Sequence, residues 1–420
     1  MDLENNYMKT CPPARTEFSL WKLLRNILFS SGKDLETSMA ARLGASRVII
    51  ADAWVKMLAE GLRSIAAGKE QKEIILPTYS CNEFTKAILL ADLIPAYAPL
   101  DEQCRLSVQA IESVYNSNTL AVLSVNNTGV ISDLMNIRNW CDSHRCLMIE
   151  DAGYTFPGTD ENGRTFGSFG HAAIINMSEG KTIPCGGAAW VINDPSFISV
   201  FSGLAAEIQS QAPKSNPAEY LKLLIYRLGS SMTGYALYKL LKSMFGGDLK
   251  ARFSSEPSRL SEDYASGNLS MKNNRMVLDE AHAMNLQKIP LRPWNRVRQS
   301  CALLILEQTA QIRASRVLRL HWWKKNLGDS VIWLSLPADA MPVKQPFLLQ
   351  QGRFNPAEIT ELAWSGIKKQ YPVSWPMYQI SRKHDKRFYE EVYTLPLHSG
   401  VSEASVRKLS AWLVQRIQVK

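Results

Sequence analysis

Two segments decide the fold: CLMIEDAGYTFPG at residues 146–158 and AAIINMSEGKTIPCGGAAWVIND at residues 172–194. The first is an apolar strand that ends in Glu150 and Asp151 and runs into a loop of small residues. The second holds two apolar strands joined by a glycine-rich loop around Lys181. Because ligands of doubly wound sheets collect at the carboxyl ends of strands, this pattern predicts a carboxylate and a lysine that face one cleft.

Similar apolar runs alternate with helical patterns between residues 45 and 195, which predicts stacked βαβ units. The runs are apolar on both faces, as buried parallel strands are. The predicted strands are Val48–Ile50, Glu73–Leu76, Leu120–Val125, Cys146–Ile149, Ala172–Met177 and Ala188–Ile192. Helices are predicted near residues 53–67, 82–92, 133–143 and 196–210. We therefore expect an α/β fold with a mainly parallel sheet flanked by helices.

A chain of 420 residues is longer than a single core usually grows, so we expect a large domain and a smaller one. The predicted division is an N-terminal segment at 1–44, a large domain at 45–245, a mobile connection at 246–274 and a small C-terminal α+β domain at 275–420. The connection is rich in Gly, Ser, Asn and charged residues. In the C-terminal part we expect a helix within Arg298–Lys325, strands at 331–336 and 346–350, and a helix at Glu403–Ile417.

Composition and charge narrow the classes of function. No run of 18 apolar residues is present, so we expect no membrane span. The N-terminus begins with acidic residues and lacks an apolar core, so we expect no signal peptide and a cytoplasmic protein. Seven scattered cysteines predict reduced thiols, and Cys141, His144 and Cys146 fit no common zinc spacing, so we expect no metal. The net charge of +9 is spread along the chain, which favours an anion-attracting site over a nucleic-acid module.

Asp151 and Lys181 together fit pyridoxal phosphate (PLP), which needs a carboxylate for its ring nitrogen and an amine that forms an imine. The carboxylate keeps the ring nitrogen protonated, and the protonated ring accepts electrons from the substrate. The deprotonated lysine forms the Schiff base and later moves a proton. Each residue alone has a plainer interpretation, Asp151 as the cap of a turn and Lys181 as a solvated loop lysine.

The same segments resemble the DegT/DnrJ/EryC1/StrS aminotransferases. That family usually has an E-D-A-A motif, a G-x-F-G turn and S-F-S-x-G-K-x-x-x-x-G-G, and this sequence has IEDAGYTF at 149–156, GSFGH at 167–171 and NMSEGKTIPCGG at 176–187. Further similar stretches lie at 76–101, 126–137 and 395–413. The resemblance runs from about residue 45 to the C-terminus. It implies a fold type I PLP-dependent transferase with PLP as the cofactor.

Position by position, the resemblance implies that Asp151 pairs with the pyridinium nitrogen and that Lys181 is the Schiff base lysine. Tyr154 stands where the family often has Gln or His near the ring hydroxyl, although a core-facing aromatic is an equally good interpretation. Ser178 keeps a hydroxyl that can bind the phosphate, unless it only forms a turn.

Other positions depart from the family pattern. Ala53 and Trp54 stand where members begin their first helix with hydroxyl residues that hold the phosphate. Asn176 replaces a usual serine, and Cys81 stands in place of the aromatic that stacks on the ring, with Tyr79 two residues earlier. We therefore expect a phosphate site that is either rebuilt or weakened. In a rebuilt site, backbone N–H groups at 52–54 hold the phosphate and Trp54 or Tyr79 covers the ring.

The resemblance also implies an active site that is completed across a homodimer interface. Asn295 and Arg296 stand at the place of the family's cross-subunit residues, unless they form a solvated helix start. The implied reaction moves an amino group from glutamate or glutamine to a keto group on a sugar nucleotide or a similar polar metabolite. The altered phosphate region leaves two alternatives open: a dehydratase or lyase on the same fold, and a non-catalytic homologue.

Overall fold

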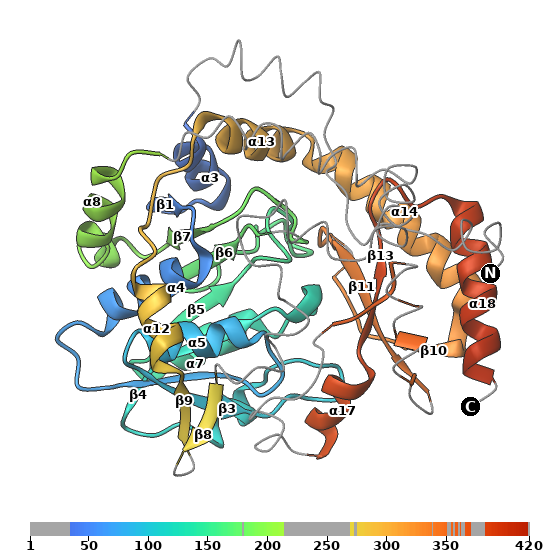
Figure 1. The fold of residues 1–420 in the computed structure, drawn as a ribbon, viewed down its shortest axis with the longest axis horizontal. Helices are drawn as coiled ribbons and strands as arrows, with labels where there is room; N and C mark the ends of the chain where they lie inside the picture. Colours follow the sequence, from blue (N-terminus) through green and yellow to red (C-terminus); the bar gives the residue numbers. More distant parts are fainter. Residues whose placement is uncertain are drawn as a thin grey trace.

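A computed structural model describes residues 34–178, 180–213, 269–272, 275–337, 339–350, 354–355, 358–359, 362, 366–370 and 383–418. Within them a large sheet with helices on both faces stands beside a smaller sheet (Figure 1). Of the predicted N-terminal segment, residues 1–33 lie outside the described residues, and Leu35–Leu43 forms helix α3. Most of the predicted connection at 246–274 also lies outside them.

The large sheet has seven strands in the order β1-β7-β6-β5-β4-β2-β3. Its strands are β1 (Arg47–Ala51), β2 (Glu73–Pro77), β3 (Ile94–Ala98), β4 (Thr119–Val125), β5 (Leu147–Asp151), β6 (Ala172–Asn176) and β7 (Ala188–Ile192). Strand β7 runs in the opposite direction to the other six strands, which therefore all end at one edge of the sheet. The six predicted strands and the mostly parallel sheet are therefore confirmed, with the direction of β7 as the exception.

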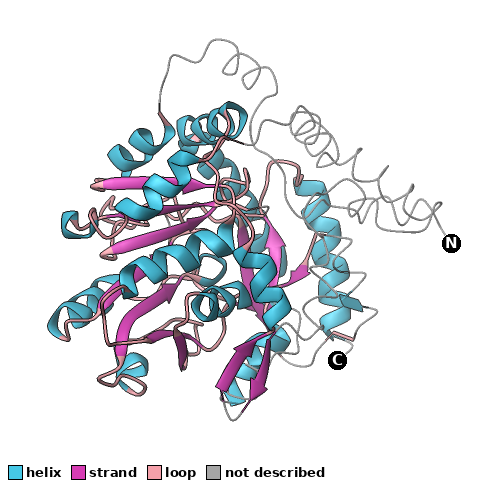
Figure 2. Cartoon of the chain, turned by 60° about the vertical axis from the view of Figure 1, so that its left-hand side comes forward, coloured by secondary structure: helices cyan, strands magenta, loops and turns pink. Residues whose placement is uncertain are grey.

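Two layers of helices cover the faces of this sheet (Figure 2). The core on one face is built with α3, α6 (Val108–Glu112), α7 (Leu134–Ser143) and α13 (Arg296–Glu307). The core on the other face is built with α4 (Trp54–Ala66), α5 (Asn82–Leu90) and α8 (Ser202–Ser210). Helix α4 packs closely enough that a side chain on Gly61 would lie 2.1 Å from Nε1 of Trp190 on β7, so the indole occupies the space that glycine leaves.

The smaller sheet has four antiparallel strands in the order β10-β11-β13-β12. They are β10 (Val331–Trp333), β11 (Lys344–Leu349), β12 (Lys368–Lys369) and β13 (Tyr393–Pro396). Helices α14 (Thr309–Leu327) and α18 (Glu403–Gln418) build the core of this unit, and α13 leads from beside α3 into α14 (Figure 1). The predicted terminal helix is thus confirmed.

Several predicted elements differ from the structure. The helical region expected at Arg298–Lys325 consists of two helices, because Gln308 separates α13 from α14. The helix expected at 196–210 begins only at Ser202, after a short turn that Asp194 caps. The sequence did not predict β3, the hairpin of β8 (Leu269–Lys272) and β9 (Arg275–Leu278), or helices α12 (Glu280–Gln287) and α17 (Lys383–Glu391).

Helix α17 holds the two sheets together at the strand ends. Its Asp385 is fully buried, and one carboxylate oxygen accepts a hydrogen bond from the hydroxyl of Thr78, just after β2, at 2.7 Å. Tyr389 donates its hydroxyl proton to the backbone oxygen of Thr78 at 2.5 Å. The smaller unit is therefore fixed against the carboxyl edge of the large sheet.

Candidate active site

The carboxyl edge of the large sheet brings together the two segments that the sequence singled out. Asp151 ends β5, and Asn176 ends the neighbouring strand β6. The chain then forms the loop with Lys181 and returns through β7, whose first residue pairs with Asn176. The loop therefore stands at the same edge as Asp151.

Asp151 is a buried carboxylate with few partners. Its side chain is 2% exposed, and Oδ1 accepts a hydrogen bond from the backbone N–H of Gly153 at 3.0 Å. Burial raises the pKa of Asp151 to about 6, although the nearby Lys181 ammonium and the Gly153 hydrogen bond oppose that rise. Among the residues that the structure describes, no group donates a hydrogen bond to Oδ2, so this oxygen can accept a donor from a ligand.

Lys181 lies against Tyr154. Its Nζ is 3.3 Å from the centre of the Tyr154 ring, a contact that favours a cation on the ring face. The Tyr154 hydroxyl accepts a hydrogen bond from Nε2 of Gln370 at 3.2 Å. Burial alone would raise the pKa of Tyr154, but Lys181, Lys344 and the Gln370 hydrogen bond outweigh it, and the pKa lies below its ordinary value.

Two of these groups come from the smaller sheet and were not predicted. Lys344 begins β11, and Gln370 directly follows β12. Strand β11 lies against the short helix η1 (Asn127–Gly129), which follows β4 at the carboxyl edge. Neither residue belongs to a motif, so no local signal in the sequence distinguishes it from other polar residues.

The loop between β6 and β7, residues 177–187, contains Lys181 and is called the lysine loop. It closes tightly on the end of β1. Gly187 has a φ of 77°, and a side chain there would lie 2.0 Å from the backbone oxygen of Ala51. This close approach places the loop beside Asp52 and Ala53, where α4 begins. Glycine is therefore required at this position by both backbone conformation and space.

We predict that Gly187→Ala destabilises the protein by at least about 2 kcal/mol, because it combines an unfavourable φ with overpacking against β1. Urea denaturation followed by circular dichroism measures the effect. Gly203→Ala is the matched control, because Gly203 lies in α8 with open space around it, and alanine is the better helix former. An unchanged midpoint for Gly187→Ala would contradict the packing described here.

The start of α4 offers backbone donors rather than side chains. Ala53 is the N-cap and Trp54 the first helical residue, and neither side chain caps the helix. The N–H of Asp52 already donates to the backbone oxygen of Arg292 at 3.0 Å. The expectation that residue 52 contributes an N–H to a phosphate is therefore wrong, whereas the N–H groups of residues 53 and 54 make no such bond to described residues.

Asn176 and Ser178 contact each other at the end of β6. Oδ1 of Asn176 accepts hydrogen bonds from the Ser178 backbone N–H at 2.9 Å and from its hydroxyl at 2.6 Å. The Ser178 hydroxyl proton is thus in use, and the hydroxyl would have to rotate before it could donate to a phosphate.

The two aromatic residues expected near the ring lie in different surroundings. The Trp54 ring meets Phe84 of α5 edge-on, with centroids 5.3 Å apart. Tyr79 is 1% exposed and packs against Phe388 and Tyr389 of α17. Tyr79 therefore supports the contact between the two sheets, and either ring would have to leave its present neighbours to cover a cofactor.

The two residues named for a cross-subunit role begin α13. The side chain of Asn295 caps this helix by accepting from the Arg298 N–H at 3.1 Å, and Arg296 is exposed. The guanidinium of Arg298 instead approaches the lysine loop, 3.5 Å from the position that a side chain on Gly186 would take.

None of the described helices is long and apolar enough to cross a bilayer. Within the same residues, no three or more His, Cys, Asp and Glu side chains are grouped to bind a metal ion.

Comparison with known sequences agrees with this arrangement. Residues 23–211 match the sequence model of the DegT/DnrJ/EryC1/StrS aminotransferase family. The GDP-perosamine synthase of Vibrio cholerae is 29% identical over 127 residues, which are 30% of this chain and 34% of that protein. The chain thus spans about a third of the length of this curated relative.

Solved structures share the fold over nearly the whole chain. PseC of Helicobacter pylori, an aminotransferase involved in the biosynthesis of pseudoaminic acid, has a TM-score of 0.69 at 15% identity, with 98% of this chain and 100% of that chain covered. The E. coli GDP-4-keto-6-deoxy-D-mannose-3-dehydratase with bound hydrated PLP has a TM-score of 0.64 at 11% identity, covering 97% and 100%. The predicted fold is confirmed. The match over residues 23–211 agrees with the family that the sequence motifs resemble.

Proposed function

We propose that the chain is a PLP-dependent aminotransferase that moves an amino group from glutamate or glutamine to a keto group on a sugar nucleotide or a similar polar metabolite. The observation that carries this proposal is the buried Asp151 carboxylate beside Lys181 at the carboxyl edge of the sheet. The family match over residues 23–211 and the names of the relatives support the reaction class and the type of acceptor.

Asp151 fits the ring nitrogen of PLP. Oδ1 is satisfied by Gly153, whereas Oδ2 accepts nothing from the described residues and belongs to a side chain that is only 2% exposed. A buried carboxylate is costly unless it is paired, and a protonated ring nitrogen supplies both a positive charge and an N–H donor. Asp151 would then hold the proton on that nitrogen.

Lys181 would carry the covalent and proton-transfer chemistry. When bound, PLP supplies an aldehyde that captures amino groups and a ring that accepts electrons. Nζ of Lys181 lies on the face of the Tyr154 ring. From there it would take a proton from the α-carbon of the amino donor and return it one step later. Tyr154, with its lowered pKa, would donate a hydrogen bond to the ring hydroxyl while Gln370 holds its oxygen in place.

The phosphate would bind where α4 begins. The N–H groups of residues 53 and 54 and the positive end of this 13-residue helix favour an anion, and Gly187 brings the lysine loop to the same place. Ser178 would join after its hydroxyl turns away from Asn176. Trp54 remains the candidate to cover the ring, because Tyr79 is enclosed by α17.

We also propose a homodimer in the cytoplasm, with Asn295 and Arg296 reaching the partner's site. Their place at the exposed start of α13 leaves Arg296 accessible to a second subunit. The division into a large domain at 45–245 and a small domain at 275–420 stays part of this proposal, with the two sheets as its basis.

The decisive experiment uses 15N-labelled glutamate and glutamine with a panel of keto-sugar nucleotides and other keto acceptors. An aminotransferase must place the label on the acceptor and release an equal amount of 2-oxoglutarate from glutamate. A product that has lost a hydroxyl and carries no label would instead establish the dehydratase alternative. Failure of the purified protein to retain PLP through dialysis, together with no turnover, would favour the non-catalytic homologue.

A further inference from the structure

A second polar cavity lies away from Asp151 and Lys181. It has a volume of about 540 Å³ and is lined by Arg42, Leu43, Gly44, Arg138, Gly163, Arg164, Thr165, Ser168, Asn193 and Asp194. Asn193 follows the last residue of β7, which pairs with the first residue of β6. This part of the lining therefore lies at the amino edge of the sheet, opposite the edge that carries Asp151.

Three arginines and one aspartate determine the charge of this cavity. Within the described part of the chain, Arg42 and Arg164 have no carboxylate partner. Partial burial lowers the pKa of Arg42 from its ordinary value, although the residue remains exposed to solvent. The lining thus carries an excess of positive charge that a ligand with two or more negative charges would balance.

Arg164 is held in place by its own turn. The turn begins and ends with a bridge between Thr159 and Thr165, and Oδ1 of Asp160 accepts the backbone N–H of Arg164 at 2.7 Å. The guanidinium donates to the hydroxyl of Ser168 at 3.2 Å and to its backbone oxygen at 2.8 Å, and it lies 4.2 Å from the centre of the Phe169 ring. Its orientation is thus fixed without a carboxylate.

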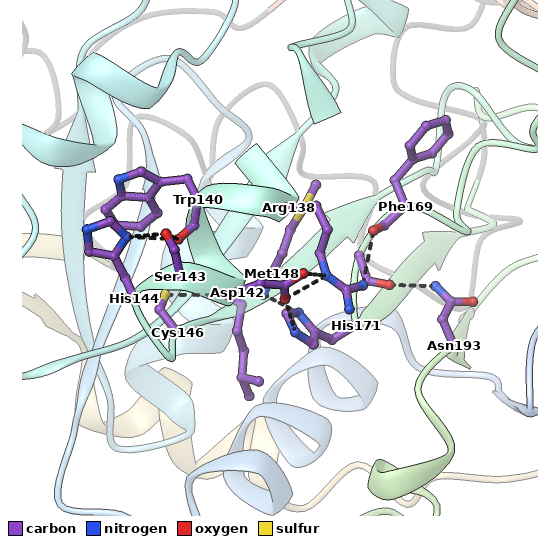
Figure 3. A network of polar contacts seen from close by, with 12 residues as sticks. Arg138, Trp140, Asp142, Ser143, His144, Cys146, Met148, Phe169, His171 and Asn193 are labelled. Carbon is purple, nitrogen blue, oxygen red and sulfur yellow. Dashed lines mark hydrogen bonds and ion pairs between the residues drawn. The ribbon is translucent and has the colours of Figure 1, made fainter. Parts of the chain in front are cut away.

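Arg138 lies on α7 and is held by several polar contacts, which Figure 3 shows. Its Nε lies 2.9 Å and 3.1 Å from the two carboxylate oxygens of Asp142, and one terminal nitrogen donates to the backbone oxygen of Phe169 at 3.3 Å. Asp142 is shared with His171, whose Nε2 is 2.9 Å from Oδ1. Since His171 Nδ1 accepts the Met148 N–H, the ring proton lies on Nε2 and is directed at Asp142.

Arg42 completes the set from the last turn of α3. Its guanidinium donates to the hydroxyl of Thr309 at 2.7 Å, and its backbone oxygen accepts from Thr165 at 3.2 Å. A neighbouring cavity of about 270 Å³ shares Arg42 but contains Arg313 paired with Asp339 at 2.8 Å. The larger cavity, and not the smaller one, therefore gathers several arginines with too few carboxylate partners.

We propose that Arg42, Arg138 and Arg164 form a second binding site, separate from the Asp151 site, for a ligand that carries a diphosphate. Guanidinium groups bind phosphate oxygens through paired hydrogen bonds, and fixed orientation lowers the entropy cost of binding. A cavity of about 540 Å³ is large enough for a molecule of nucleotide size. The site does not depend on the proposed transaminase reaction.

Calorimetric titration of the PLP-loaded protein with inorganic pyrophosphate at low ionic strength tests the proposal. The double variant Arg42→Gln with Arg164→Gln should bind at least tenfold more weakly than the wild type. The control is Arg63→Gln with Arg105→Gln, which removes the same charge from two arginines that have carboxylate partners elsewhere. Absence of binding to the wild type, or equal losses in both double variants, would overturn the site.

A second pair of variants distinguishes a loss of binding from misfolding. Gly163 lines the cavity with a φ of 80° and open space around it, and Asp and Asn both tolerate this conformation. Gly163→Asp should weaken pyrophosphate binding by repulsion, whereas Gly163→Asn should not. Equal affinities in these two variants would also overturn the proposal. Titration with UDP then separates the sources: tighter binding than pyrophosphate assigns a nucleotide, and equal binding assigns the diphosphate alone.

Discussion

Lys181→Ala should abolish the covalent attachment of PLP and reduce turnover by about 10⁴-fold, because one substitution removes both the nucleophile and the proton carrier. Borohydride should trap the cofactor on the wild-type peptide that contains Lys181 and leave the variant peptide unmodified, as read by mass spectrometry. The absorbance band of the lysine-bound cofactor, near the boundary between ultraviolet and visible light, should disappear with the same substitution. An unchanged spectrum would reject the assignment of Lys181.

The control for this prediction is Lys69→Ala, because Lys69 is an exposed lysine beyond the end of α4. A second readout separates chemistry from packing. Added methylamine should restore part of the turnover of Lys181→Ala if the missing amine is the cause, since a free amine can enter the space that the side chain left. No rescue, combined with a lowered unfolding midpoint, would indicate a structural role on the face of Tyr154.

The sequence predicted those parts of the site that lie close together along the chain. Asp151 and Lys181 are 30 residues apart; Asp151 ends one apolar strand, and Lys181 lies in the loop after the next. The antiparallel return through β7 was also within reach, because residues 177–187 are too few for a parallel crossover with a helix. Strand β3 was missed because its first four residues are not fully buried and it includes Pro95, so its pattern is that of an edge.

The contributions of Lys344 and Gln370 could not be predicted. Both lie more than 150 residues beyond Lys181, and only the packing of the smaller sheet against the strand ends brings them to Tyr154. Tertiary contacts of this kind leave no periodicity in the sequence. The same holds for Arg298, which approaches the lysine loop because α13 packs beside α3, near β1 (Figure 1).

Asp151→Asn should raise the stability of the apoprotein at pH 8 and lower both PLP affinity and turnover. The folded-state pKa of Asp151 is raised from 3.8 to about 6, so burial favours the protonated form. The contribution of Asp151 protonation to the stability of the folded apoprotein is therefore fully present below about pH 4 and is lost as the pH rises through 6. At pH 8 the apoprotein must bury the charged carboxylate, at a cost of up to about 3 kcal/mol.

Asparagine removes that cost and keeps an oxygen that can accept the Gly153 N–H. The apo form of Asp151→Asn should therefore resist urea better than the wild-type apoprotein at pH 8 and equally at pH 4. Asp92→Asn, at an exposed position, should show no such pH-dependent gain in stability.

With PLP present, the wild type should be more stable than Asp151→Asn, because asparagine cannot hold the proton on the ring nitrogen. Both the PLP affinity and the turnover of the variant should fall by at least about 10²-fold. A variant that gains no stability at pH 8 would show that the carboxylate is not buried in charged form, and one that keeps full turnover would remove Asp151 from the proposed chemistry.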